Sequence, residues 1–147
     1  MTRRKTQPWA DETVDRLLAK GLRNGGARRT VIELLAEQNC CLTAQEIFDE
    51  LRASGRQVGI ASIYRILELL TAEGAIQRID LGSGTARYEP IVAGGHHHHL
   101  VCDICGKVEA FADRALEHAL TRVEQRSGYA VAGHDVVLHG ECGDCAA

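Results

Sequence analysis

Residues 96–106, HHHHLVCDICG, place four histidines and two cysteines in one short stretch. Imidazole and thiolate groups are the usual protein ligands of zinc and related transition metals. The run lies inside the 147-residue chain, whereas a purification tag would stand at an end. We therefore expect the segment to belong to the fold and its chemistry to be metal binding.

The cysteines of this stretch have a counterpart near the C-terminus, since CDIC is matched there by CGDC. Two Cys-x-x-Cys pairs can complete a tetrahedral shell with zinc–sulfur distances of about 2.3 Å. Such a shell leaves no open position for a substrate, so we predict a structural zinc site that contributes to folding. A redox pair or four buried thiols would be the alternative, but neither pair opens a helix within a βαβ unit. The predicted ligands are Cys102, Cys105, Cys142 and Cys145.

The histidine run can serve two metal sites rather than one. HHHHLVC has the composition of a strand, in which successive side chains point to opposite faces. His96 and His98 would then face one way, and His97 and His99 the other. Each pair could contribute to its own site, with four solvated histidines as the alternative.

Further ligands must come from later in the sequence. ADRALEHALTRVEQRSG predicts an amphipathic helix with Glu117 near its middle, and YAVAGHDVVLHGEC predicts a strand carrying His134. A carboxylate with imidazoles is a common ligand set for zinc or iron(II). Taken singly, His118 and His139 are expected to be ordinary surface side chains.

The sequence of the first half of the chain predicts a separate module made mainly of helices. TVDRLLAKGL and GARRTVIELLAEQN have helical periodicity, and TAQEIFDEL opens with a capping box between Thr43 and Glu46. IASIYRILELLTAEG predicts a further helix that ends at Gly74. The expected core positions are Ala27, Val31, Leu34, Leu35, Ala44, Ile47, Phe48, Leu51, Ile60, Ile63, Leu67 and Leu70.

The last two of these helices fit a helix-turn-helix whose second helix enters a DNA major groove. Ser62 and Arg65 would lie on its exposed face, with Tyr64 beside them. The following segment, AIQRIDLGSGTARYEP, predicts a β-hairpin of the kind that forms a wing. The order is that of a winged helix, although an ordinary surface helix at SIYRIL is the alternative.

Composition separates the chain into two functional halves. Residues 1–30 hold eight Lys or Arg against three Asp or Glu, whereas all seven histidines lie beyond residue 95. The basic N-terminal arm suits nucleic acid, or is a solvated tail. The sequence has neither a secretory signal nor an apolar run long enough to span a membrane, so we expect a cytoplasmic protein.

Together, SIYRIL, HHHHLVCDICGKVEAF, GYAVAGHDVVLHGEC and the final Cys-x-x-Cys resemble the ferric uptake regulator family of metal-responsive repressors, from about Gly21 to Cys145. The resemblance implies an α+β protein. A winged-helix DNA-binding domain at residues 1–90, with a basic N-terminal arm, would precede a small α/β dimerisation domain at residues 91–147 with the four-cysteine zinc site. It also implies a homodimer that binds palindromic double-stranded DNA and is not an enzyme.

The resemblance assigns residues to three further sites. The regulatory divalent metal, zinc or iron, would be held by Glu89, His97 and His99, together with Cys41 at a position where many iron-sensing members have histidine. An additional metal would be held by His96, His98, Glu117 and His134. DNA contacts would come from Tyr64, Arg65 and Arg28, beside Ser62 of the predicted recognition helix.

Departures from the family pattern bear on these assignments. The sequence GGARR lacks the threonine and glutamine that usually precede the arginine matched by Arg28. Cys41 and His98 make the ligand set softer than in iron sensors, which favours zinc, although Cys41 could instead be a buried apolar residue beside Cys40. Peroxide sensing, metal storage or delivery, and metal-dependent hydrolysis at His96, His98 and Glu117 are the alternative functions.

Overall fold

The structure is a computed structural model that describes residues 7–23 and 25–147. It divides into a winged-helix unit, Met1–Gly95, and a C-terminal unit, His96–Ala147. The predicted basic arm at residues 1–6 lies outside the described residues. The predicted boundary at residue 90 falls five residues before this division, and Ile91 N donates to Ala75 O at 2.9 Å within the first unit. No helix in the described part of the chain has the length and apolarity needed to cross a membrane.

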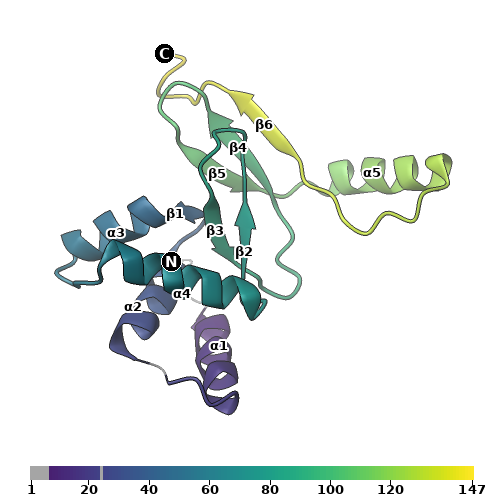
Figure 1. Ribbon diagram of the computed structural model, residues 1–147. Helices are drawn as coiled ribbons and strands as arrows, with labels where there is room; N and C mark the ends of the chain where they lie inside the picture. The colour runs from purple at the N-terminus through teal and green to yellow at the C-terminus, as the bar shows by residue number, and fades with distance from the viewer. Residues whose placement is uncertain (1–6, 24) are drawn as a thin grey trace. The chain divides into compact units, whose positions relative to one another are not determined.

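The first unit has the predicted winged-helix order (Figure 1). Its strands form an antiparallel sheet of order β1-β3-β2, in which β2 and β3 are the arms of the wing. The fold class predicted from the sequence is therefore confirmed for this half. The elements are α1 (Gln7–Ala19), α2 (Gly26–Glu37), β1 (Leu42–Thr43), α3 (Ala44–Ala53), α4 (Ile60–Ala72), β2 (Ile76–Ile79) and β3 (Arg87–Pro90).

Local signals set several of these helix ends. The predicted capping box at α3 is present, because Thr43 Oγ1 accepts from Glu46 N at 3.0 Å and Glu46 Oε2 accepts from Thr43 N at 2.9 Å. Gly74 follows α4 with φ of 69°, a left-handed conformation that glycine adopts without steric cost. Helix α1 begins earlier than its apolar periodicity predicts. Pro8 is tolerated in its first turn, and the buried Trp9 donates from Nε1 to Ala75 O at 3.0 Å.

The helices of this unit enclose one apolar core. Val31, Leu35, Ile63 and other predicted positions are almost fully buried. Two predicted core positions were wrong: Ala27 and Ile60 are exposed, because each stands in the first turn of its helix at the margin of the core.

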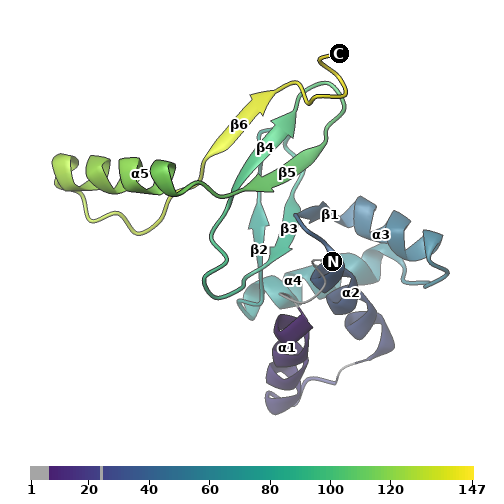
Figure 2. The same cartoon turned by 180° about the vertical axis from the view of Figure 1, so that it is seen from behind.

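The C-terminal unit consists of β4 (His98–Cys102), β5 (Val108–Phe111), α5 (Arg114–Ser127) and β6 (Val137–Gly140). Its sheet has the order β5-β4-β6, with β4 antiparallel to β5 and parallel to β6. Helix α5 projects away from this sheet in both views (Figures 1 and 2) and buries none of its residues. The predicted strands were too long, since β4 begins at His98 and β6 begins only at Val137, opposite His99.

Candidate functional site

The four predicted cysteines lie together at one end of the C-terminal sheet. Their sulfur atoms are all within 4.8 Å of one another, and Cys105 Sγ lies 3.8 Å from Cys142 Sγ. A tetrahedral zinc–thiolate centre with bonds of about 2.3 Å has sulfur atoms about 3.8 Å apart, so the geometry suits zinc. We call Cys102, Cys105, Cys142 and Cys145 the four-cysteine cluster.

The parallel pairing of β4 with β6 assembles this cluster from distant parts of the chain. Cys102 stands opposite Gly140, and Asp103 N donates to Gly140 O at 2.8 Å. The first pair sits in a turn closed by Gly106, which has φ of 76° and donates from N to Cys102 O at 2.9 Å. The second pair forms a similar turn, in which Cys145 N donates to Cys142 O at 2.9 Å. Each turn therefore presents two sulfur atoms to the same point.

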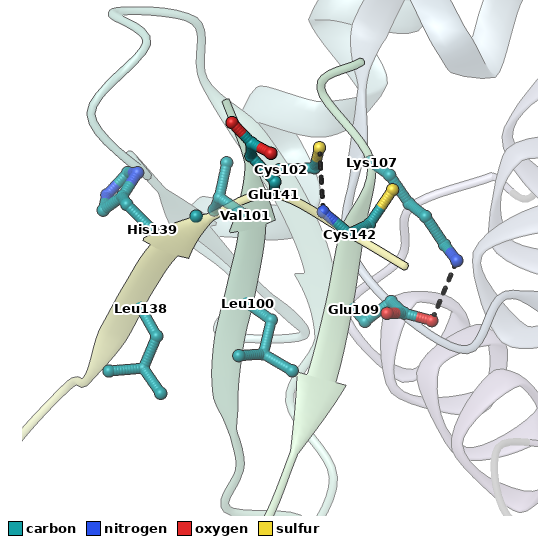
Figure 3. A pocket seen from close by; sticks show the side chains of 10 residues that line it. Leu100, Val101, Cys102, Lys107, Glu109, Leu138, His139, Glu141 and Cys142 are labelled. Carbon is teal, nitrogen blue, oxygen red and sulfur yellow. Dashed lines mark hydrogen bonds and ion pairs between the residues drawn. The ribbon is translucent and has the colours of Figure 1, made fainter. Parts of the chain in front are cut away.

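Hydrogen bonding polarises the thiols of the cluster unequally. Backbone N–H groups of Cys105 and Cys142 lower the pKa of Cys102 to about 6, and Cys142 N lies 3.3 Å from Cys102 Sγ (Figure 3). Side-chain hydrogen bonds with Cys142 and Cys105 raise the pKa of Cys145 to about 12. Metal binding would displace the protons that remain, so affinity for zinc should fall as the pH falls.

A second cluster joins the start of β4 to α5 and to the chain before β6. Glu117 lies at its centre, with Oε1 at 2.6 Å from His98 Nε2 and Oε2 at 2.9 Å from His134 Nε2. His96 Nε2 lies 3.1 Å from His134 Nε2. The four ligand atoms are within 4.8 Å of one another, a set suited to a divalent transition metal. We call His96, His98, Glu117 and His134 the histidine–glutamate cluster.

Hydrogen bonds define the state of this cluster when it holds no metal. His98 is buried, and its Nδ1 accepts from Val136 N at 3.2 Å, which leaves the proton of the neutral ring on Nε2. Hydrogen bonds from His98, and then from His134, hold the pKa of Glu117 below its usual value. Coordination through His98 Nε2 would require the ring proton to move to Nδ1, and therefore rearrangement of the Val136 contact.

The other two histidines of the run also lie together in the C-terminal unit. The ring centroids of His97 and His99 are 5.1 Å apart. The sequence parity argument thus matches the grouping of the histidines, even though His96 and His97 precede the strand. His118 and His139 lie on the surface, and His139 Nδ1 is 3.0 Å from Asp103 Oδ1.

In the winged-helix unit the structure brings Cys41 close to Glu89. Strand β1 pairs with β3, so that Leu42 faces Tyr88. The potential ligand atoms of Cys40, Cys41 and Glu89 lie within 4.8 Å of one another. Glu89 Oε1 accepts from Gln77 Nε2 at 2.6 Å, while hydrogen bonding with Cys40 and burial raise the pKa of Cys41. Cys40 was absent from the predicted ligands, although the sequence NCC shows it beside Cys41.

Three of the four predicted DNA-contacting residues, Ser62, Arg65 and Arg28, line one hollow of the winged-helix unit. Tyr64 and Arg65 are exposed on α4, and Arg65 Nη2 donates to Ser62 Oγ at 3.1 Å. Arg28, at the start of α2, lines the same hollow as Ser62 and Arg65. Arg23 also lines it, and Arg28 donates to Arg23 O. Sequence periodicity missed Arg23 because it lies in the loop before α2.

The exposed face of the C-terminal sheet carries apolar side chains. Leu100 on β4 and Leu138 on β6 are register partners, are 39% and 49% exposed, and lie side by side (Figure 3). They line a hollow that extends to Cys102 and Cys142. The charged pair Lys107 and Glu109, 3.2 Å apart, borders it.

Comparison with known proteins gives consistent matches along most of the chain. The model of the ferric uptake regulator family matches residues 19–139. The ferric uptake regulation protein of Neisseria meningitidis is 32% identical over 137 residues, covering 91% of this chain and 93% of that protein. The corresponding protein of Legionella pneumophila is 32% identical over 135 residues, covering 91% and 98%.

Solved structures share the fold. The ferric uptake regulator Fur of Helicobacter pylori aligns with a TM-score of 0.81 and 28% identity, covering 97% of this chain and 94% of that one. That structure is described as revealing three functional metal binding sites. The Vibrio cholerae ferric uptake regulator aligns with a TM-score of 0.77 and 28% identity, covering 88% and 98%.

Proposed function

The chain belongs to the ferric uptake regulator family, and we propose that it acts there as a metal-dependent repressor of metal uptake and homeostasis genes. The observation that carries this proposal is that helix α4 exposes Tyr64 and Arg65 beside a hollow lined by Arg23 and Arg28, while the C-terminal unit gathers two clusters of metal ligands. The protein would bind palindromic operators as a homodimer in the cytoplasm, without catalysing a reaction.

Helix α4 would read the DNA major groove. Tyr64 and Arg65 are exposed on its outer face, where an arginine can contact a guanine edge or a phosphate. Arg23 and Arg28 line the adjoining hollow and would contact phosphates, which position the protein without reading sequence. Arg28 would thus keep a DNA role even though the residues before it depart from the family pattern.

The metals would have different tasks. Zinc in the four-cysteine cluster would be structural, because four sulfur ligands leave no open position. The regulatory divalent metal, zinc or iron, would be held by Cys41 and Glu89 of one unit and by His97 and His99 of the other. The histidine–glutamate cluster would hold a further ion. The Helicobacter pylori relative is likewise described with three metal sites.

Ligands from two units would couple metal binding to DNA binding. A complete ligand shell exists only in arrangements that bring Cys41 and Glu89 to His97 and His99. These residues would therefore restrict the position of the recognition helix relative to the dimer. Coupling free energies of about 1–3 kcal/mol are typical of such linkage, which corresponds to about 5–150-fold in DNA affinity.

Dimerisation would proceed through the C-terminal unit. Apolar side chains that a lone unit leaves in water include Leu100, Leu138 and Val123, the last of these 54% exposed on α5. Exposed apolar side chains that lie side by side, as Leu100 and Leu138 do, are typical of a protein interface. A two-fold dimer would place two recognition helices on the two half-sites of one palindrome.

The proposal is tested by selecting duplexes from a random DNA pool with and without zinc, iron(II) or manganese. We expect a palindromic consensus that is bound only with metal. The double variant His97→Ala, His99→Ala should remain folded but lose most of the metal response, while His118→Ala, an exposed histidine outside both clusters, should behave as wild type. A storage or delivery protein would bind metal without selecting DNA. Unchanged metal-dependent binding by the double variant would contradict the regulatory site.

A further inference from the structure

Cys40 is left without a role by the proposed function, which uses only its neighbour Cys41. The two sulfur atoms lie 3.6 Å apart, and both are within 4.8 Å of a carboxylate oxygen of Glu89. We propose that Cys40 is a second thiolate ligand and that this cysteine pair selects zinc over iron and manganese. This inference rests on the regulatory site of the proposed function. The winged-helix unit would then supply two sulfurs and one oxygen.

The distance between the sulfurs fits joint coordination. Thiolates bound to one zinc ion in a tetrahedral centre lie about 3.8 Å apart, close to the separation of Cys40 and Cys41. The sulfurs are too far apart for a disulfide, whose bond is about 2.05 Å. The pair is thus arranged as two ligands of one ion would be.

The backbone holds this pair in place before any metal binds. Helix α2 ends at Glu37, shortly before Cys40, and β1 begins at Leu42, directly after Cys41. Strand β1 is paired with β3, which carries Glu89, and the capping box fixes the start of α3 at the other end of β1. Ligands held in this way require little reordering on binding.

Neighbouring charge suits an anionic ligand set. Arg87 Nη1 lies 3.5 Å from Cys41 O and 3.1 Å from Glu46 Oε2, so a guanidinium stands beside the pair. Two thiolates and a carboxylate carry three negative charges, which a divalent cation and this arginine, shared with Glu46, would partly offset. Cys40 is partly exposed and Cys41 is buried, so a bound cation would be needed for both sulfurs to carry charge there.

Ligand softness gives the selectivity. Thiolates favour zinc, whereas carboxylate and imidazole ligands also suit iron(II) and manganese. A site with Glu89 and histidines alone would discriminate weakly between these ions, and two sulfurs shift it to zinc. If the cysteines only fill space, replacing either sulfur by the smaller oxygen of serine would leave metal preference unchanged.

The direct test is cobalt(II) absorption of the full-length protein after the four-cysteine cluster has been loaded with zinc. Cobalt then reports the remaining sites, and each cobalt–thiolate bond adds charge-transfer absorption in the near ultraviolet. We expect this band in the wild type, about half of it in Cys40→Ser and in Cys41→Ser, and none in the double variant. His96→Ala, which alters the other cluster, is the matched control and should keep the full band.

A competition experiment tests the selectivity. Even outer-shell partners of metal ligands contribute about 10–100-fold to affinity, so loss of a direct ligand should weaken zinc binding by at least about tenfold. Manganese binding should change much less in Cys40→Ser. No sulfur band in the wild type, or an unchanged band and zinc-to-manganese preference in Cys40→Ser, would overturn the inference.

These outcomes are separable from failure of the proposed function. If the wild type binds DNA in a metal-dependent way but shows no cobalt–thiolate band, the proposed repressor function is supported and the inference about the cysteine pair is wrong. If the protein shows a cobalt–thiolate band but binds no DNA with any metal, the cysteine pair is supported as a set of metal ligands and the proposed repressor function is wrong.

Discussion

The two units of this chain are held together in different ways. The clustered buried apolar residues of the described structure all belong to the winged-helix unit, between Trp9 and Tyr88. In the C-terminal unit, the described residues that are buried are only His98, His99 and Cys102. A segment of about 50 residues rarely stabilises itself by burial alone and usually needs metal or a partner chain. Hydrocarbon packing therefore maintains the first unit, whereas the proposed metal sites and dimer interface would maintain the second.

The largest effect should come from removing a ligand of the four-cysteine cluster. Structural zinc contributes about 10–16 kcal/mol in small zinc-dependent domains, more than the C-terminal unit can replace by packing. Cys102→Ser should therefore lose tightly bound zinc and unfold this unit, leaving a protease-resistant fragment that ends near Gly95. Elemental analysis and limited proteolysis measure both effects.

The matched control for this change is Cys40→Ser in the other unit. It should retain chelator-resistant zinc and the proteolytic pattern of the wild type. Full resistance of the C-terminal unit in zinc-free Cys102→Ser would show that packing suffices there, and the comparison between the units would fail.

The second effect concerns the apolar core. Leu35 is fully buried, and Leu35→Ala should lower the free energy of unfolding of the winged-helix unit by about 2–5 kcal/mol. Zinc content should be unchanged, because the four-cysteine cluster lies in the other unit. Urea denaturation of zinc-loaded protein measures the change. Leu18→Ala, at a leucine that is 52% exposed, should cost less than about 0.5 kcal/mol; equal costs would contradict the assigned core.

A third substitution tests whether the exposed apolar side chains of the C-terminal unit form the dimer interface. Leu138→Asp should weaken dimerisation at least about tenfold, equivalent to about 1.4 kcal/mol, because a charge would be buried in the proposed interface. Sedimentation equilibrium measures the dissociation constant. Leu18→Asp, an equally exposed leucine in the other unit, should leave it unchanged. An unaffected dimer in Leu138→Asp would place the interface elsewhere.

The smallest effect is expected at a helix cap. Thr43→Ala removes the hydroxyl that accepts from Glu46 N, which should cost about 1 kcal/mol in the winged-helix unit. Chemical denaturation measures it, with Thr30→Ala, at a helical hydroxyl that bonds Gly26 O, as the control of smaller effect. A loss of tightly bound zinc from Thr43→Ala would show that the two units are not independently stabilised.

Sequence reasoning succeeded where the signal was local. The capping box, the glycine that ends α4 and the spacing of the cysteine pairs each depend on a few neighbouring residues. The histidine parity also matches the grouping in the structure, because alternation continues just outside the strand. The start of α1, the length of β6 and the convergence of Arg23 with Arg65 depend on tertiary contacts, such as Trp9 with Ala75, which periodicity does not encode.

Helix α5 contacts the rest of its unit through side-chain hydrogen bonds near its N-terminal end. Glu117, in its first turn, contacts His98 and His134, whereas Val123, further along, faces solvent. A helix of 14 residues is about 21 Å long, so a 10° tilt at the fastened end displaces the other end by about 3.5 Å. An ion in the histidine–glutamate cluster would act on this end of the helix, and through the helix on the position of Val123.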